Sequence, residues 1–158
     1  MCKLILAVGV LLISVTAGFA QTGAKKIDPC NLLTKVEIQQ VLGQGATDGK
    51  LNPTGGGGPT CSYTVGGFGV LSIVARPARA DEIPDQMLPE FKKHNVKAEE
   101  VKGVGDRAIL TFPGYGMVQL LAFKGSSVLM VQLMMSGATE DKEKVLVRKL
   151  TQKALVKL

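Results

Sequence analysis

The 158-residue sequence has a single histidine, His94, and no Cys-x-x-Cys pair. His94 lies in the charged stretch KKHN with no evident carboxylate to orient it, so a solvated surface histidine is favoured over a Ser-His-Asp triad. Glu99 and Glu100 are adjacent and would point to opposite faces of a strand, so they cannot act as a pair. We therefore predict no catalytic, metal or cofactor site, although an enzyme with an unrecognised active site stays an open alternative.

Long apolar runs are absent beyond the first twenty residues. There, Lys3 precedes an uncharged apolar run that ends in GFA at 18–20, a pattern typical of a secretory signal peptide with a small-x-small cleavage site. The run is marginal for a bilayer-spanning helix, which needs about 20 apolar residues. We therefore predict a signal peptide at 1–20, a single domain at 21–158 and a periplasmic or extracellular location. After cleavage no membrane-spanning segment is expected.

Cysteine is scarce, with three in the chain, and Cys2 falls in the predicted signal peptide. The remaining pair, Cys30 and Cys61, reads as one disulfide in an oxidising compartment. Between the two lies GQGATDGKLNPTGGGGPT at 43–60, a Gly-rich segment that is costly to order. The bridge is expected to fasten the first helix to the first strand across this loop, stabilising the fold by about 3–4 kcal/mol in the chain-entropy model.

Acidic side chains are outnumbered. Without Lys3, 18 basic and 13 acidic side chains remain, a net charge of +5, and much of the excess lies near the C-terminus. A basic surface favours acidic partners, so weak contact of a basic C-terminal helix with an anionic surface is one interpretation. A solvated helix face that keeps the protein soluble is favoured instead. Nucleic acid is not an expected partner of an exported protein.

Three segments predict helices. The T-x-x-E pattern at 34–37 is a capping box, and Gly43 supplies the stop for the helix that follows it. Residues 81–94 predict a helix that Pro89 kinks or ends. Thr139 is the expected N-cap of a last helix, whose apolar residues recur at spacing three or four: Val147, Leu150, Ala154 and Leu158.

Alternating apolar runs predict strands at 61–65, 68–76, 107–112, 117–124 and 127–135. Gly66-Gly67 and Gly125-Ser126 are signals for two-residue hairpin turns. The charged segment at 96–107 is expected to be an exposed strand or loop that turns at Gly105-Asp106. The order of elements predicts an α+β fold, with one twisted, mainly antiparallel sheet of about five strands covered by the N- and C-terminal helices.

A turn at Gly125-Ser126 places Gln119 opposite Gln132 within an otherwise apolar hairpin. Because a buried amide must be satisfied, a mutual or backbone hydrogen bond is the favoured role. The alternative is that Gln119 and Gln132 are the polar groups of an apolar ligand pocket.

Three motifs carry a resemblance: DPCNLLT at 28–34 followed by Glu37, CSY at 61–63, and GVGDRA at 103–108. They resemble landmarks of a family of small exported bacterial proteins, often lipoproteins, that is catalogued only as a domain of unknown function. The resemblance spans most of the mature chain and implies an extracytoplasmic, disulfide-bonded α+β domain. It implies no reaction. This chain lacks the lipid-attachment cysteine that many members carry.

These features together predict a non-enzymatic binding or interaction module of the periplasm or cell envelope. Its partner would be an unknown small apolar molecule or an envelope protein, held in an apolar groove between sheet and helix or on the basic C-terminal face. The alternative is an inhibitor or immunity-type protein that blocks an envelope or secreted enzyme through a loop at 52–60 or 113–116.

Overall fold

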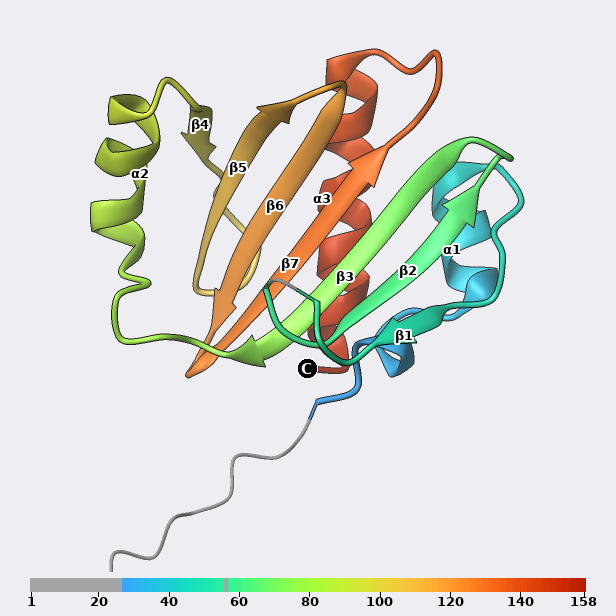
Figure 1. Ribbon diagram of the computed structural model, residues 1–158, viewed down its shortest axis with the longest axis horizontal. Helices are drawn as coiled ribbons and strands as arrows, with labels where there is room; N and C mark the ends of the chain where they lie inside the picture. The colour runs from blue at the N-terminus through green and yellow to red at the C-terminus, as the bar shows by residue number, and fades with distance from the viewer. Residues whose placement is uncertain (1–26, 56) are drawn as a thin grey trace, which may run out of the picture.

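The computed structural model describes residues 27–55 and 57–158 (Figure 1). The predicted signal peptide at 1–20 lies outside the described residues. The described part is an α+β fold, with three α-helices, a short 3-10 helix and one seven-stranded antiparallel sheet. The predicted fold class is therefore confirmed, while the expected number of about five strands is too low.

The chain builds the sheet as two antiparallel meanders that meet at β3 and β7, in the spatial order β1-β2-β3-β7-β6-β5-β4. The strands are β1 (Lys50–Asn52), β2 (Thr60–Val65), β3 (Gly69–Pro77), β4 (Lys97–Glu100), β5 (Arg107–Gly114), β6 (Met117–Lys124) and β7 (Ser127–Met134). The helices are η1 (Pro29–Asn31), α1 (Lys35–Leu42), α2 (Pro84–Lys93) and α3 (Glu140–Val156). The segment with α2 carries the chain from β3 to the far edge of the sheet (Figure 1).

The two additional strands, β1 and β4, form the two edges of the sheet. All three residues of β1 are exposed, and three of the four residues of β4 are exposed. Short, polar edges of this kind discourage pairing with other chains. They also lack the apolar alternation from which the other five strands were predicted, which is why the sequence did not indicate them clearly.

The hairpin turns agree with the sequence in one case and differ in the other. Gly125-Ser126 is a two-residue turn, and the expected register is present, with Gln119 opposite Gln132. The turn at Gly66-Gly67 has a third residue, Phe68, because Val65 pairs with Gly69. The two-residue prediction was wrong there, and the additional residue leaves the Phe68 ring 83% exposed.

The helices divide the sheet into a well covered face and a partly covered one. Helices α1 and α3 lie behind the sheet in Figure 1, and their apolar residues share one core with the inward residues of β2, β3 and β5–β7. The prediction that the terminal helices cover the sheet is confirmed for this face. On the opposite face Met87 of α2 packs against a smaller cluster, which comprises Leu121, Phe123 and Val128.

Helix α1 begins and ends as its sequence predicts. Thr34 Oγ1 accepts a hydrogen bond from the Glu37 N–H at 3.2 Å, and Glu37 Oε2 accepts one from the Thr34 N–H at 2.8 Å. Gly43 closes the helix in the left-handed region at φ 66°. The capping box and the glycine stop are therefore confirmed.

Helix α2 runs from Pro84 to Lys93 and continues through Pro89, so the prediction that Pro89 ends the helix is wrong, while a kink there stays a prediction. A proline inside a helix removes one N–H and leaves the carbonyl four residues earlier, here that of Asp85, without its partner. Both Pro89 and Asp85 are exposed, so water can hydrogen-bond this carbonyl. The cost of the proline is therefore smaller than in a buried helix.

The predicted disulfide between Cys30 and Cys61 is present, with Cα atoms 5.0 Å apart. It joins η1 to β2, and the Cys61 side chain is fully buried. Next to it the Tyr63 hydroxyl donates a hydrogen bond to the Leu33 carbonyl at 2.8 Å. The covalent bond and the buried hydrogen bond together attach the segment before α1 to the sheet.

The two terminal helices are also linked by an ion pair 120 residues apart in sequence, in which Lys157 Nζ lies 2.6 Å from Glu37 Oε2. The hydrogen bond from Lys157, reinforced by Thr34, lowers the pKa of Glu37 to about 2. The carboxylate therefore stabilises the fold above its unfolded pKa near 4.5, and this contribution is lost as the pH falls toward 2.

We expect Lys157→Met to lower the free energy of unfolding by about 0.5–1 kcal/mol at neutral pH, the usual worth of a partly exposed ion pair. The difference from the unmodified protein should shrink as the pH falls below about 4, because a protonated Glu37 no longer attracts the ammonium. Denaturant unfolding at a series of pH values measures it. A difference that stays constant down to about pH 2 would contradict the pairing.

Candidate functional site

Two hollows follow one another along the seam between α3 and β5, on the face of the sheet that α3 covers. Helix α3 packs across β6 and β7, whereas β5 and β4 lie beyond it toward the edge of the sheet. The seam is therefore open on the side of β5 and β4. The first, which we term the Arg148 hollow, has a volume of about 220 Å³. The second, the Glu143 hollow, has about 210 Å³.

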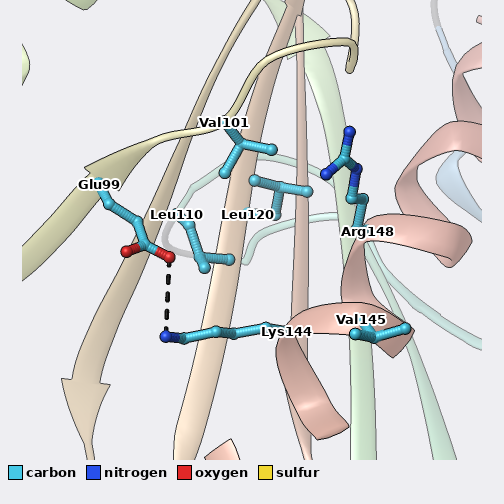
Figure 2. Close-up of a pocket in the computed structure, with 7 residues that line it drawn as sticks. All are labelled: Glu99, Val101, Leu110, Leu120, Lys144, Val145 and Arg148. Carbon is cyan, nitrogen blue, oxygen red and sulfur yellow. Dashed lines mark ion pairs between the residues drawn. The ribbon is translucent and has the colours of Figure 1, made fainter. Parts of the chain in front are cut away.

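The Arg148 hollow has an apolar floor and a charged rim (Figure 2). Leu110 and Leu120 of the sheet form the floor and are buried, whereas Val145 of α3 is 52% exposed at the rim. The hollow is lined by Glu99, Val101, Leu110, Leu120, Lys144, Val145 and Arg148. This arrangement can hold a small apolar group while the charged side chains stay in contact with water.

The charges at this rim are engaged with each other. Lys144 Nζ lies 3.2 Å from Glu140 Oε1 and 3.7 Å from Glu99 Oε1, the second contact being drawn in Figure 2. The hydrogen bond with Glu140 raises the pKa of Lys144. Arg148 Nη2 donates to the carbonyl of Lys102 at 2.8 Å. The rim therefore fixes the position of α3 against β4 and the turn after it.

The Glu143 hollow lies at the N-terminal end of α3, next to the turn between β5 and β6. Glu143 is only 3% exposed, and its Oε1 accepts a hydrogen bond from the Met135 N–H at 2.7 Å. Burial raises the pKa of Glu143, and the neighbouring Glu140 raises it further. The hollow is lined by Phe112, Gly114, Gly116, Met117, Val118, Met135, Ala138, Glu140 and Glu143.

Phe112 and Lys144 lie where the two hollows meet. Phe112 lines the Glu143 hollow, and Lys144 lines the Arg148 hollow. The Lys97 ammonium lies 4.5 Å from the centre of the Phe112 ring, and the Lys144 ammonium lies 4.9 Å from it. Contacts of this length between a cation and an aromatic ring are attractive. This part of the seam therefore already accommodates cations.

Gln119 and Gln132, the residues expected in a pocket, lie on the opposite face of the sheet. Gln132 Nε2 donates to Gln119 Oε1 at 2.7 Å, so the predicted mutual hydrogen bond is confirmed. The space beside Gln132 is about 20 Å³, which is the size of roughly one water molecule. A ligand-binding role for the two amides stays a prediction, and neither of them lines the hollows of the seam.

Within residues 27–55 and 57–158, no group of three or more His, Cys, Asp or Glu side chains could hold a metal ion. The described part also contains no helix that combines the length and the apolar character needed to cross a membrane. His94 is on the surface, with Nε2 3.7 Å from Glu90 Oε2, too long for a hydrogen bond.

Sequence reasoning missed Glu143, although its position carried a signal. Glu143 stands four residues before Val147, so it continues the spacing that predicted the buried residues Val147, Leu150 and Ala154. A carboxylate on the apolar stripe of a helix is unusual, because carboxylates are rarely fully buried unless paired. This exception to the helical pattern is the signal in the sequence that distinguishes Glu143 from the other acidic residues of the segment.

No protein-family model, curated protein or solved structure is similar to this chain at a significant level. The resemblance to the family of small exported proteins therefore stays a prediction, and the geometry of the molecule carries the functional argument alone.

Proposed function

We propose that this chain is a non-enzymatic binding module that works outside the cytosol and holds a small, mainly apolar molecule in the seam between α3 and β5. The observation that carries the proposal is the pair of adjoining hollows of about 220 and 210 Å³ along this seam. Ligand sites are typically concave and apolar with a few polar groups. The seam has this composition and matches the groove between sheet and helix that the sequence suggests.

Export is the second part of the proposal. The bridge between Cys30 and Cys61 is compatible with it, because such bonds persist in oxidising compartments. The predicted signal peptide at 1–20 supports it independently. A contact of the basic C-terminal helix with anionic surfaces is a weaker element, since Lys144 and Lys157 of this segment are paired with carboxylates.

Binding of a small molecule in the seam can be tested by filling one of the two hollows with a larger side chain. Val145→Trp places a large ring at the rim of the Arg148 hollow, so we expect the variant to lose the small molecule that the unmodified protein carries. Native mass spectrometry after incubation with an extract of small molecules from the producing cells measures this.

Val36→Trp is the matched control, because Val36 is a similarly exposed valine on α1, 60% against 52%, and does not line the seam. It should keep the bound molecule. An unmodified protein that acquires no small molecule from the extract would contradict the proposal.

A second candidate function, inhibition of an envelope or secreted enzyme, is favoured by one observation in the loop at 113–116. Tyr115 is 98% exposed and has a positive φ of 56°. This conformation is costly for a residue other than glycine and is often kept for function. A pull-down from envelope extract distinguishes the candidates, since one stoichiometric protein partner would support inhibition over small-molecule binding.

A further inference from the structure

We propose that the Glu143 hollow binds the ammonium group of a small organic cation, with the Glu143 carboxylate as its counter-charge. The inference rests on the proposed function, since it names the ligand class for one part of the same seam. Four features of the hollow carry it: the burial of Glu143, its unused oxygen, the balance of charge around it and the apolar walls.

Glu143 is buried without a cation. Its side chain is 3% exposed and lines the hollow, yet within the described residues no basic nitrogen lies within 4 Å of it. Only Oε1 is hydrogen-bonded there, to the Met135 N–H, and Oε2 has no partner in the described part of the chain. Oε2 is not among the fully buried atoms without a partner, so it is accessible from the hollow, and a cation that enters there can meet this oxygen.

A purely structural role does not require a carboxylate at this position. The contact with the Met135 N–H needs one oxygen acceptor, which the amide of glutamine would supply at a lower desolvation cost. The second oxygen is therefore the part of the side chain that this contact leaves unexplained. Ammonium groups donate strong, charge-assisted hydrogen bonds to such an oxygen.

The charges around the hollow favour a cation over an anion. With the adjoining rim included, three basic side chains stand against four carboxylates, namely Lys97, Lys144 and Arg148 against Glu99, Glu140, Asp141 and Glu143. Three of these carboxylates share the two lysines, and Glu143 is the one left without a basic partner among the described residues. An added anion would meet this negative excess, whereas an added cation would reduce it.

The walls of the hollow define the rest of the ligand. Phe112, Met117, Val118, Met135 and Ala138 provide apolar surface, and the glycines at 114 and 116 leave backbone exposed at the mouth. The volume of about 210 Å³ is below the range of sites for drug-sized ligands. A single ring or a short alkyl chain bearing one ammonium group suits this space.

The experiment is an NMR titration of the disulfide-bonded protein with cyclohexylammonium and, separately, with cyclohexanol at about pH 8, where the amine is protonated. Burial raises the pKa of Glu143, and a mildly alkaline pH favours its ionised form. We expect cyclohexylammonium to shift the amide signals of Gly114, Gly116 and Met135 and to bind at least about tenfold more tightly than cyclohexanol, the worth of one charge-assisted hydrogen bond.

Glu143→Gln should remove this preference and keep the fold, because Gln can still accept the hydrogen bond from Met135. Asp141→Asn is the matched control: it removes one negative charge from the same helix turn, but Asp141 is 94% exposed and does not line the hollow. We expect it to change the affinity by less than about twofold, as exposed charges are well screened. Circular dichroism verifies that both variants are folded.

Three results would overturn the inference: equal binding of the amine and the alcohol, retention of amine binding in Glu143→Gln, or an equal loss in Asp141→Asn. The comparison of amine with alcohol uses the unmodified protein, so it holds even if Glu143→Gln fails to fold. If cyclohexanol binds at the seam and cyclohexylammonium does not, the inferred ammonium site is wrong, but the proposed function is still supported. If neither the probes nor any molecule from the cell extract binds in the seam, both the ammonium site and the proposed function are contradicted.

Discussion

Reduction of the bond between Cys30 and Cys61 is expected to lower the free energy of unfolding by about 3–4 kcal/mol. The two cysteines are 31 residues apart, and the bond restricts the unfolded chain across the Gly-rich segment between them. Because small domains are typically stable by only about 5–15 kcal/mol, this loss is a large share of the total. Denaturant unfolding with and without a reductant measures it.

The double variant Cys30→Ala with Cys61→Ala is the control for effects of the reductant itself. Its midpoint should lie close to that of the reduced protein and should not respond to reductant. The loss should be largest around η1 and α1, where hydrogen exchange would show reduced protection, because only non-covalent contacts, such as the hydrogen bond from Tyr63 to Leu33, then hold this segment. Two reactive thiols in the native protein without denaturant would contradict the bridge.

Gly105→Ala is expected to lower the free energy of unfolding by about 3 kcal/mol or more, the sum of a backbone cost and a steric cost. Gly105 has a φ of +60°, a conformation that costs a residue with a Cβ atom about 1–2 kcal/mol. In addition, a Cβ atom there would lie 2.4 Å from the carbonyl oxygen of Phe123, which is backbone and cannot move aside easily. The same oxygen accepts a hydrogen bond from the Asp106 N–H at 2.8 Å, so a shift would break this contact too.

Gly125→Ala separates the two causes. Its φ of +56° is nearly the same, but nothing lies within 4 Å of the added Cβ atom. This variant should therefore lose only about 1–2 kcal/mol, the cost of the backbone conformation. Thermal unfolding of both variants gives the difference, which is the contribution of the close approach to Phe123. Equal losses would show that the approach has no effect.

The motif GVGDRA at 103–108 illustrates what a sequence conveys and what it does not. As a pattern it predicted a turn, and the structure has one. The reasons for its residues lie elsewhere in the chain: Gly105 faces Phe123, and Asp106 Oδ2 accepts a hydrogen bond from the Gly125 N–H at 2.7 Å. A contact across nearly twenty residues leaves no local periodicity, so the sequence alone could not show it.

Apart from the disulfide, which was predicted from the number of cysteines, local interactions account for most of the predictions that were confirmed. The capping box of α1, the turn at Gly125-Ser126 and the strand alternation each depend on residues within a few positions of one another. The edge strands β1 and β4 depend on pairing with distant strands and carry exposed residues, so their pattern is weak. The unbroken α2 depends on the exposure of Pro89, which the fold determines.

The candidate site was predictable only in outline. A groove between sheet and helix follows from the fold class, but its position follows from how far α3 extends over the sheet, which no motif encodes. Gln119 and Gln132 attracted attention as polar residues in an apolar hairpin, and they satisfy each other. Glu143 differs from them, because one of its carboxylate oxygens has no partner among the described residues.

The direction of α3 also determines how the molecule could be immobilised. The first described residues and the C-terminus lie at the same end of the molecule in Figure 1, where Lys157 meets Glu37. The Glu143 hollow is at the other end of this helix, whose 17 residues span about 25 Å. A sensor surface or affinity tag joined to either end would therefore leave the mouth of the hollow turned toward the solution.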